Sequence, residues 1–181
     1  MNQFRKLNKP TFIDIIWNLS RKVTYANINI KQSSYFEFGA HLYRFKKNIK
    51  FQSNVYLKRN AILGCANSDA LISVGENTTI GNGTIIISSE EIVIGDNCMI
   101  APYVHIVDSN HGMESDKPYN QQENFTGPVS IGDNTWIGSG VVILPGVSIG
   151  AGSIIGAGSV VTKSFPVNSK IMGIPAKEKD N

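Results

Sequence analysis

Residues 131–161 read IGDNTWIGSGVVILPGVSIGAGSIIGAGSVV, and this stretch repeats with a period of six. An aliphatic residue recurs at every sixth position, and a small or β-branched residue recurs four positions after it. The aliphatic positions are Ile131, Ile137, Ile143, Ile149, Ile155 and Val161, and the second set is Thr135, Val141, Val147, Ser153 and Ser159. Amphipathic helices repeat about every 3.6 residues and half-buried strands about every two, so a sustained period of six indicates another architecture.

The repeat predicts a solenoid of short strands joined by tight corners. Gly and Asn take the positive φ that a tight corner demands, and β-branched residues suit a strand. Three hexapeptides would form one triangular coil, with each aliphatic side chain stacked inward on its counterpart in the next coil. The same period continues upstream in shifted frames, which predict insertions at corners. The upstream positions are Ile62, Val74, Ile80, Ile86, Ile94, Ile100 and Ile106.

The run from residue 131 to 166, followed by GIPAK at 173–177, resembles the left-handed β-helix acyltransferases, in particular the galactoside and maltose O-acetyltransferase group. The resemblance implies an all-β fold, a left-handed parallel β-helix, although general rules favour right-handed crossovers. We expect a single domain over 1–181. Its parts would be an N-terminal cap and irregular first coils (1–59), a hexapeptide β-helix (60–163) and a short C-terminal tail (164–181).

Near the N-terminus, apolar residues recur at helical spacing. Phe12, Ile15, Ile16, Leu19 and Val23 lie three or four positions apart, which predicts one short amphipathic helix. We expect it to cap the open end of the solenoid or to pack on a neighbour. The aromatic and basic residues after it suit irregular first coils, since terminal repeats are normally atypical, with a sugar-binding face as the alternative.

The repeat stops between Ile106 and Ile131, where VDSNHGMESDKPYNQQENFTGPVS takes its place. This composition predicts a protruding loop near 107–129, and long loops in compact domains tend to be functional. The loop contains His111. An imidazole can take a proton from a hydroxyl that attacks a thioester and return it to the leaving thiolate.

The resemblance assigns roles to individual residues. It implies that His111 is the catalytic base, with a solvated loop histidine as the alternative. The residues expected to contact coenzyme A are Ser139, Ala157, Thr162, Lys163 and Lys177. The related group has arginine at the position of Lys177, so we expect a weaker phosphate contact there, and ordinary solvated charge is the alternative for both lysines.

Three further residues are candidates for the substrate site. Asn82 matches an asparagine beside the acetyl and acceptor groups of the related enzymes. Asp108 could orient His111 or the acceptor, or it could simply form a turn. Trp136 is a large aromatic on a wall of small residues, which suits either an apolar groove or a subunit contact.

Composition limits the alternatives. The formal charge of +3 is too small to indicate nucleic acid, although basic residues are concentrated before residue 60. Cys65 and Cys98 lack the spacing of a zinc or disulfide framework, so we expect buried free thiols. No apolar run approaches the roughly 18 residues of a membrane span, so we expect a cytoplasmic protein.

The resemblance, together with these features, implies an acetyl-CoA-dependent O-acetyltransferase, and we expect that it requires no metal. Its acceptor would be a sugar hydroxyl in bacterial surface polysaccharide synthesis, and its active sites would lie between the subunits of a homotrimer. One alternative is a nucleotide-sugar N-acetyltransferase. Others are a zinc enzyme of the γ-carbonic anhydrase type, using His41, His105 and His111, and a structural solenoid without chemistry.

Overall fold

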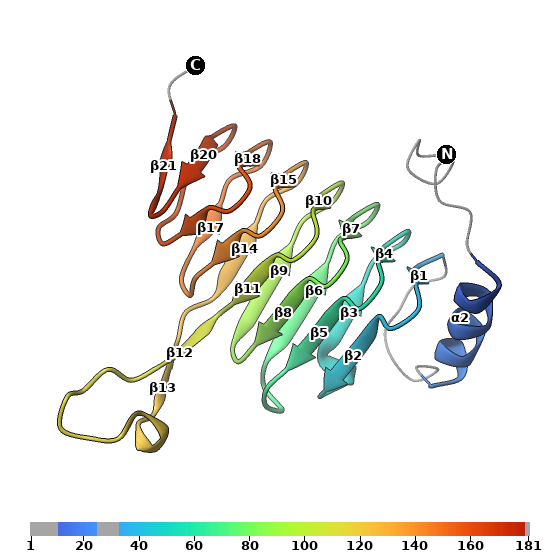
Figure 1. Cartoon of the computed structure of the whole chain (residues 1–181), viewed down its shortest axis with the longest axis horizontal. Coiled ribbons are helices and arrows are strands. Elements are labelled where there is room, and N and C mark those ends of the chain that lie inside the picture. The colour runs from blue at the N-terminus through green and yellow to red at the C-terminus, as the bar shows by residue number, and fades with distance from the viewer. Residues whose placement is uncertain (1–10, 25–32, 180–181) are drawn as a thin grey trace.

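The computed structural model describes residues 11–24 and 33–179 of the chain. Over these residues short strands stack into a left-handed parallel β-helix of about six turns, with a helix at its N-terminal end (Figure 1). The predicted fold class is therefore confirmed. Each turn has three sides, which stack along the axis into three walls.

The walls are three parallel sheets. Wall 1 contains β1 (Tyr35–Phe36), β4 (Tyr56–Leu57), β7 (Thr79–Ile80), β10 (Met99–Ile100), β15 (Trp136–Ile137), β18 (Ile154–Ile155), β20 (Lys170–Gly173) and, antiparallel to β20, β21 (Ala176–Glu178). Wall 2 contains β2 (His41–Arg44), β5 (Ile62–Cys65), β8 (Ile85–Ser88), β11 (His105–Val107), β16 (Val142–Ile143) and β19 (Val160–Val161). Wall 3 contains β3 (Ile49–Phe51), β6 (Leu71–Val74), β9 (Glu91–Ile94), β14 (Val129–Ile131) and β17 (Ser148–Ile149). A short 3-10 helix, η1 (Lys46–Asn48), joins β2 to β3.

The core is the column of side chains that the period of six predicts. Every one of the periodic residues between 131 and 161 is at most 3% exposed. Ile137 pairs with Ile155 one turn later, so identical positions stack along the axis. The buried hydroxyls of Thr135 and Ser153 donate to the carbonyls of Gly132 and Gly150, each at 2.7 Å. Small polar residues are tolerated in this core because the corner carbonyls satisfy them.

The upstream register is correct except at Ile62. Ile62 pairs with Ile85 on the outer face, whereas Leu63 pairs with Ile86 and is fully buried. Because Ile62 and Leu63 are adjacent and both apolar, the sequence alone does not decide which of them faces the core. A shift of one residue exchanges the two faces of a strand. The corner at 66–70 is longer than a regular corner, so Leu63 and the next inward-facing position are more than six residues apart.

The corners use Asn and Gly as predicted. Asn54, Asn60, Asn77, Asn97, Asn134 and Asn168 have φ between 54° and 61°, and Gly83, Gly140 and Gly158 have φ between 64° and 69°. This left-handed conformation is accessible to Gly and, among other residues, most readily to Asn. The corners therefore follow directly from local residue choice.

The predicted N-terminal helix is α2 (Phe12–Thr24), and it lies beside β1 at the end of the solenoid (Figure 1). The backbone N–H of Asp14 bonds to the Thr11 hydroxyl at 3.2 Å, and that of Thr11 to the Asp14 carboxylate at 2.9 Å, a capping arrangement. Asp14 also accepts from the backbone N–H of Phe38 at 3.0 Å and pairs with Arg59 at 3.2 Å. Trp17 donates to the carbonyl of Ala40 at 3.3 Å. The helix thus docks on the first coil by its polar side. The side chain of Val23 lies outside the described residues.

Docking of α2 should be sensitive to acid. Burial would raise the pKa of Asp14, but hydrogen bonds from Thr11 and Phe38 and the charge of Arg59 outweigh it and lower the pKa to about 2. Because the folded pKa is depressed, the stabilisation is present above about pH 4 and is lost as the pH falls toward 2, and it is worth on the order of 2 kcal/mol. Fluorescence of Trp17 in a Trp136→Phe background should report undocking in this range. An Asp14→Asn variant should show no such transition, and a wild-type signal that is flat to pH 2 would contradict the assignment.

The C-terminal residues close the other end of the column. Phe165 forms a bridge to Ile149, and β20 pairs with β18, which buries Ile171 completely. Cys65 and Cys98 are free and at most 1% exposed, as expected, and burial raises the pKa of both thiols, that of Cys65 to about 11. Within residues 11–24 and 33–179, no helix has both the length and the apolar character needed to cross a membrane.

Candidate active site

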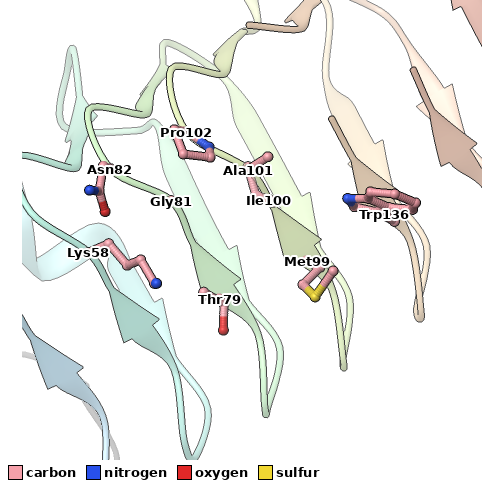
Figure 2. Close-up of a pocket in the computed structure, with 9 residues that line it drawn as sticks. All are labelled: Lys58, Thr79, Gly81, Asn82, Met99, Ile100, Ala101, Pro102 and Trp136. Carbon is pink, nitrogen blue, oxygen red and sulfur yellow. The ribbon is translucent and has the colours of Figure 1, made fainter. Parts of the chain in front are cut away.

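A pocket of about 310 Å³ lies on the outer face of wall 1 and its corner with wall 2 (Figure 2). Thr79, Met99 and Trp136 occupy the same outward register position on three successive strands of this wall. Met99 is 37% exposed and Trp136 is 50% exposed, so both present apolar surface to the pocket. The lining residues are Lys58, Thr79, Gly81, Asn82, Met99, Ile100, Ala101, Pro102 and Trp136.

The pocket has a polar end and an apolar end. Figure 2 shows Lys58 and Asn82 on one side, with Met99 and Trp136 toward the other. Gly81 lies between them, where a Cβ would come within 2.4 Å of the carbonyl carbon of Ala101. A side chain at this position would therefore collide with the next coil. An amide and an ammonium opposite an indole suit a ligand with both polar and apolar parts.

The corner beside this pocket contains a conformational outlier. Tyr103 follows Pro102 and has φ 60°, a conformation uncommon for a bulky residue. Its backbone N–H donates to the carbonyl of Asn82 at 2.9 Å, and its ring covers Gly83, where a Cβ would lie 2.8 Å from ring carbons. Gly83 and Gly140 occupy the same corner position in the neighbouring coils and also have positive φ, so the corner geometry accounts for the conformation of Tyr103.

The structure brings two predicted residues, Asn82 and Trp136, into one pocket. Sequence reasoning missed Lys58, Thr79 and Met99, which are far apart in the chain and meet only because coils stack. Their shared outward register with Trp136 could have identified Thr79 and Met99. The insertion between Met99 and Trp136 conceals that register.

The predicted protruding loop is an ordered arm, defined here as residues 107–129. It contains an antiparallel pair, β12 (Ser109–His111) and β13 (Asn124–Thr126), and a 3-10 turn, η2 (Tyr119–Gln121). Figure 1 shows the arm projecting from the solenoid between β11 and β14. The Gln122 side chain accepts from the backbone N–H of Glu114 at 2.9 Å and donates to its carbonyl at 2.8 Å. The arm therefore has its own internal hydrogen bonds.

His111 lies on β12 of the arm, opposite Asn124, and is exposed. The arm leaves the solenoid at the corner between walls 2 and 3, whereas the pocket lies on wall 1 and its corner with wall 2. A single chain therefore does not bring His111 to Asn82 and Trp136. Met113 and Tyr119 in the arm are 74% and 67% exposed, so the arm carries apolar surface away from its own solenoid.

Asp108 anchors the base of the arm, which corrects the expectation that it binds the acceptor or orients His111. Its side chain is completely buried. The carboxylate accepts from the Ser88 hydroxyl at 2.6 Å and from the backbone N–H groups of Ser89 and Glu90 at 2.6 and 2.9 Å. Both oxygens are engaged with the preceding coil, so Asp108 joins two coils instead of forming a local turn.

The five residues expected to contact coenzyme A are all exposed on the C-terminal coils. Ser139 and Ala157 stack on the corner between walls 1 and 2, where the N–H of Gly158 donates to the carbonyl of Ser139 at 2.8 Å. A Cβ added at Gly140 or Gly158 would have no described atom within 4 Å. The backbone at Gly140 and Gly158 therefore faces open space beside the exposed Ser139 and Ala157.

The other three cofactor candidates lie on separate elements. Thr162 and Lys163 follow β19 at the corner between walls 2 and 3, with the Lys163 ammonium 5.5 Å from the ring centre of Phe165. Lys177 lies on β21, opposite Met172. Ser139 and Ala157 thus lie on one side of wall 2, Thr162 and Lys163 on its other side, and Lys177 on a hairpin at the end of wall 1, so one chain does not gather the five residues around a single point.

The histidines of one chain do not form a metal site. His41 and His105 share an outward register on wall 2, but three strand spacings separate them, about 14 Å. His111 lies on the arm. In the part of the chain that the structure describes, no three His, Cys, Asp or Glu side chains are grouped closely enough to hold a metal ion.

Comparison with known proteins places this arrangement in a family. Residues 128–163 match the model described as bacterial transferase hexapeptide (six repeats). The chain is 42% identical over 106 residues to the galactoside O-acetyltransferase of Escherichia coli, a match that covers 59% of this chain and 52% of the relative. It is 38% identical to the solved maltose O-acetyltransferase of Clostridium difficile, covering 78% of this chain and 68% of that one, with a TM-score of 0.56.

The chain belongs to the hexapeptide-repeat acyltransferase family. A further solved member, a galactoside acetyltransferase in complex with coenzyme A, is 34% identical over 79% of this chain and 64% of that one, with a TM-score of 0.58. The chain spans about half the length of the curated relatives it matches. Four of the five cofactor candidates, all except Lys177, lie within the segment that matches the family model.

Proposed function

We propose that the protein is an acetyl-CoA-dependent O-acetyltransferase that acts on a sugar hydroxyl, with His111 as the general base. The observation that carries the proposal is the separation of two incomplete half-sites on one chain. Among the described residues, the lining of the pocket with Asn82 and Trp136 contains no histidine or carboxylate that could accept a proton, and His111 on the arm is not part of that lining. Closed oligomers repeat both halves around an axis, so the arm of one protomer can meet the pocket of the next.

A homotrimer with active sites between subunits fits this geometry. A triangular solenoid presents three similar walls, and the arm extends well beyond its own walls (Figure 1). The exposed apolar residues Met113, Tyr119 and Phe125 give the arm a surface to bury against a partner. Relatives of this chain are named galactoside and maltose O-acetyltransferases, which supports a carbohydrate acceptor.

The described residues suit acetyl-CoA as the donor. The open space at Gly140 and Gly158, beside Ser139 and Ala157, can admit a narrow pantetheine arm, and the exposed Lys163 and Lys177 can attract phosphates. His111 would take the proton of the acceptor hydroxyl as its oxygen attacks the thioester carbonyl. The C–S bond then breaks and the imidazolium returns the proton to the thiolate, so no acyl-enzyme is required.

We place the reaction in the cytoplasm, in the synthesis of a bacterial surface polysaccharide. The test is an acetyl transfer assay with acetyl-CoA and a panel of hydroxy sugars, oligosaccharides and amino sugars, followed by release of the coenzyme A thiol and by mass spectrometry. We expect release that depends on a hydroxy sugar and an ester product that mild base removes. Transfer confined to amino sugars would replace the proposal with N-acetylation. A lack of transfer, together with no rise in thermal stability on adding coenzyme A, would contradict it.

A further inference from the structure

The apolar face of helix α2 is exposed and does not pack on the protein's own core. Five apolar residues of α2 are between 45% and 76% exposed, namely Phe12, Ile13, Ile15, Ile16 and Leu19. A surface helix normally buries such a face against its own core. Here the opposite side, with Asp14 and Trp17, is bonded to the first coil, so the apolar face points away from the solenoid. Figure 1 shows α2 at the N-terminal end, beyond β1.

The N-terminal third of the sequence is strongly basic. Residues 1–60 contain 12 Lys and Arg but 2 Asp and Glu, a formal charge of +10, whereas residues 61–181 contain 5 and 12, a formal charge of −7. These two values add to the net +3 of the chain. On the first coil, Arg44, Lys47 and Lys50 are exposed beside Tyr43 and Phe45, which are 50% and 45% exposed. Basic and amphipathic aromatic side chains thus accompany the apolar helix face.

We propose that this N-terminal end binds an anionic lipid bilayer, with α2 lying in the plane of the surface. An apolar helix face gains by entering the acyl boundary, and flanking Lys and Arg gain from anionic headgroups. Because Asp14 and Trp17 hold α2 against the first coil, the bilayer would contact the end of the solenoid. The pocket on wall 1 would stay accessible from the side. The inference does not depend on the proposed enzyme activity.

Charge favours a bilayer over a second copy of the chain as the occupant. A second copy that met this end through its own N-terminal end would bring an equal excess of positive charge to the contact, and like charges at close range oppose association. An anionic surface complements both the charge and the apolar face. We therefore take an anionic bilayer as the partner of this end.

The test is sedimentation of the full chain with vesicles of phosphatidylcholine alone and of phosphatidylcholine with phosphatidylglycerol. We expect binding to the anionic vesicles about tenfold or more tighter than to the neutral ones, and weaker binding as salt is raised. A triple Phe12→Ser, Ile16→Ser, Leu19→Ser variant should lose about tenfold or more in affinity for the anionic vesicles. A Lys47→Glu, Lys50→Glu variant should lose the preference for anionic lipid.

Val167→Ser is the matched control, because Val167 is 63% exposed but lies near the C-terminal end, and it should bind like the wild type. Circular dichroism and light scattering of each variant report folding and subunit number. Equal binding to both kinds of vesicle, or none, would overturn the proposal. A change of subunit number in the triple variant, with no vesicle binding by the wild type, would assign the face to a second copy instead.

Discussion

Replacing His111 with alanine is expected to lower the rate of acetyl transfer by about a hundredfold or more, because proton transfer by a positioned side chain contributes about that much. The effect should fall on kcat, since His111 is proposed to act on the proton of the attacking hydroxyl. Steady-state kinetics with acetyl-CoA and the preferred acceptor measure it. His111→Gln, which keeps a polar side chain but cannot take the proton, should lose as much.

His105 provides the matched control. It is an exposed histidine three positions before Asp108, but it points outward from wall 2. His105→Ala should therefore retain activity within about a factor of three, whereas both His111 variants lose it. Unchanged turnover in His111→Ala, with the protein folded and its subunit number preserved, would remove His111 from the mechanism.

The same variant tests whether the site is shared between subunits. Mixed trimers of His111→Ala and Asn82→Ala chains would contain some sites with an intact arm from one chain and an intact pocket from the other. Random mixing in equal amounts should restore about a quarter of the wild-type activity. If both residues served one chain's own site, no mixture would exceed the parent variants.

Replacing Asp108 with alanine is expected to destabilise the fold by about 3 kcal/mol. The substitution removes the acceptor of the Ser88 hydroxyl and of the backbone N–H groups of Ser89 and Glu90, in a place where Asp108 itself is completely buried. Each buried donor left without a partner costs about 1–3 kcal/mol, partly offset by relaxation. Urea unfolding measures the change in the free energy of unfolding.

Two variants separate this anchor from a general effect of charge. Asp108→Asn should be destabilised less, because its amide oxygen still accepts one of the three bonds while its NH₂ group opposes a donor. Asp116→Ala removes an exposed carboxylate from the same arm and should change stability by less than about 0.5 kcal/mol. Wild-type stability in Asp108→Ala would show that the buried bonds do not hold the arm.

The sequence by itself determined the coil and its interruption. The residue at every sixth position from Ile131 to Val161 is buried, and Asn134 and Gly158 take the positive φ expected of corners. These features are local: side-chain direction alternates along any strand, and only certain residues turn a corner cheaply. The arm at 107–129 was equally visible, since the period fails there.

Tertiary structure alone decided which side chains meet. Lys58, Met99 and Trp136 share a pocket although they are far apart in the sequence. Long corners and the arm add residues without adding coils, so the distance between two residues in the sequence does not give their distance along the axis of the β-helix. Stacking also turned Asp108 inward onto the preceding coil, and docking of Asp14 turned the apolar face of α2 outward. The periodicity determines which side chains of a segment point toward the axis of the β-helix. Contacts between coils depend on the register of one coil on the next, which is set only when the whole column of coils packs.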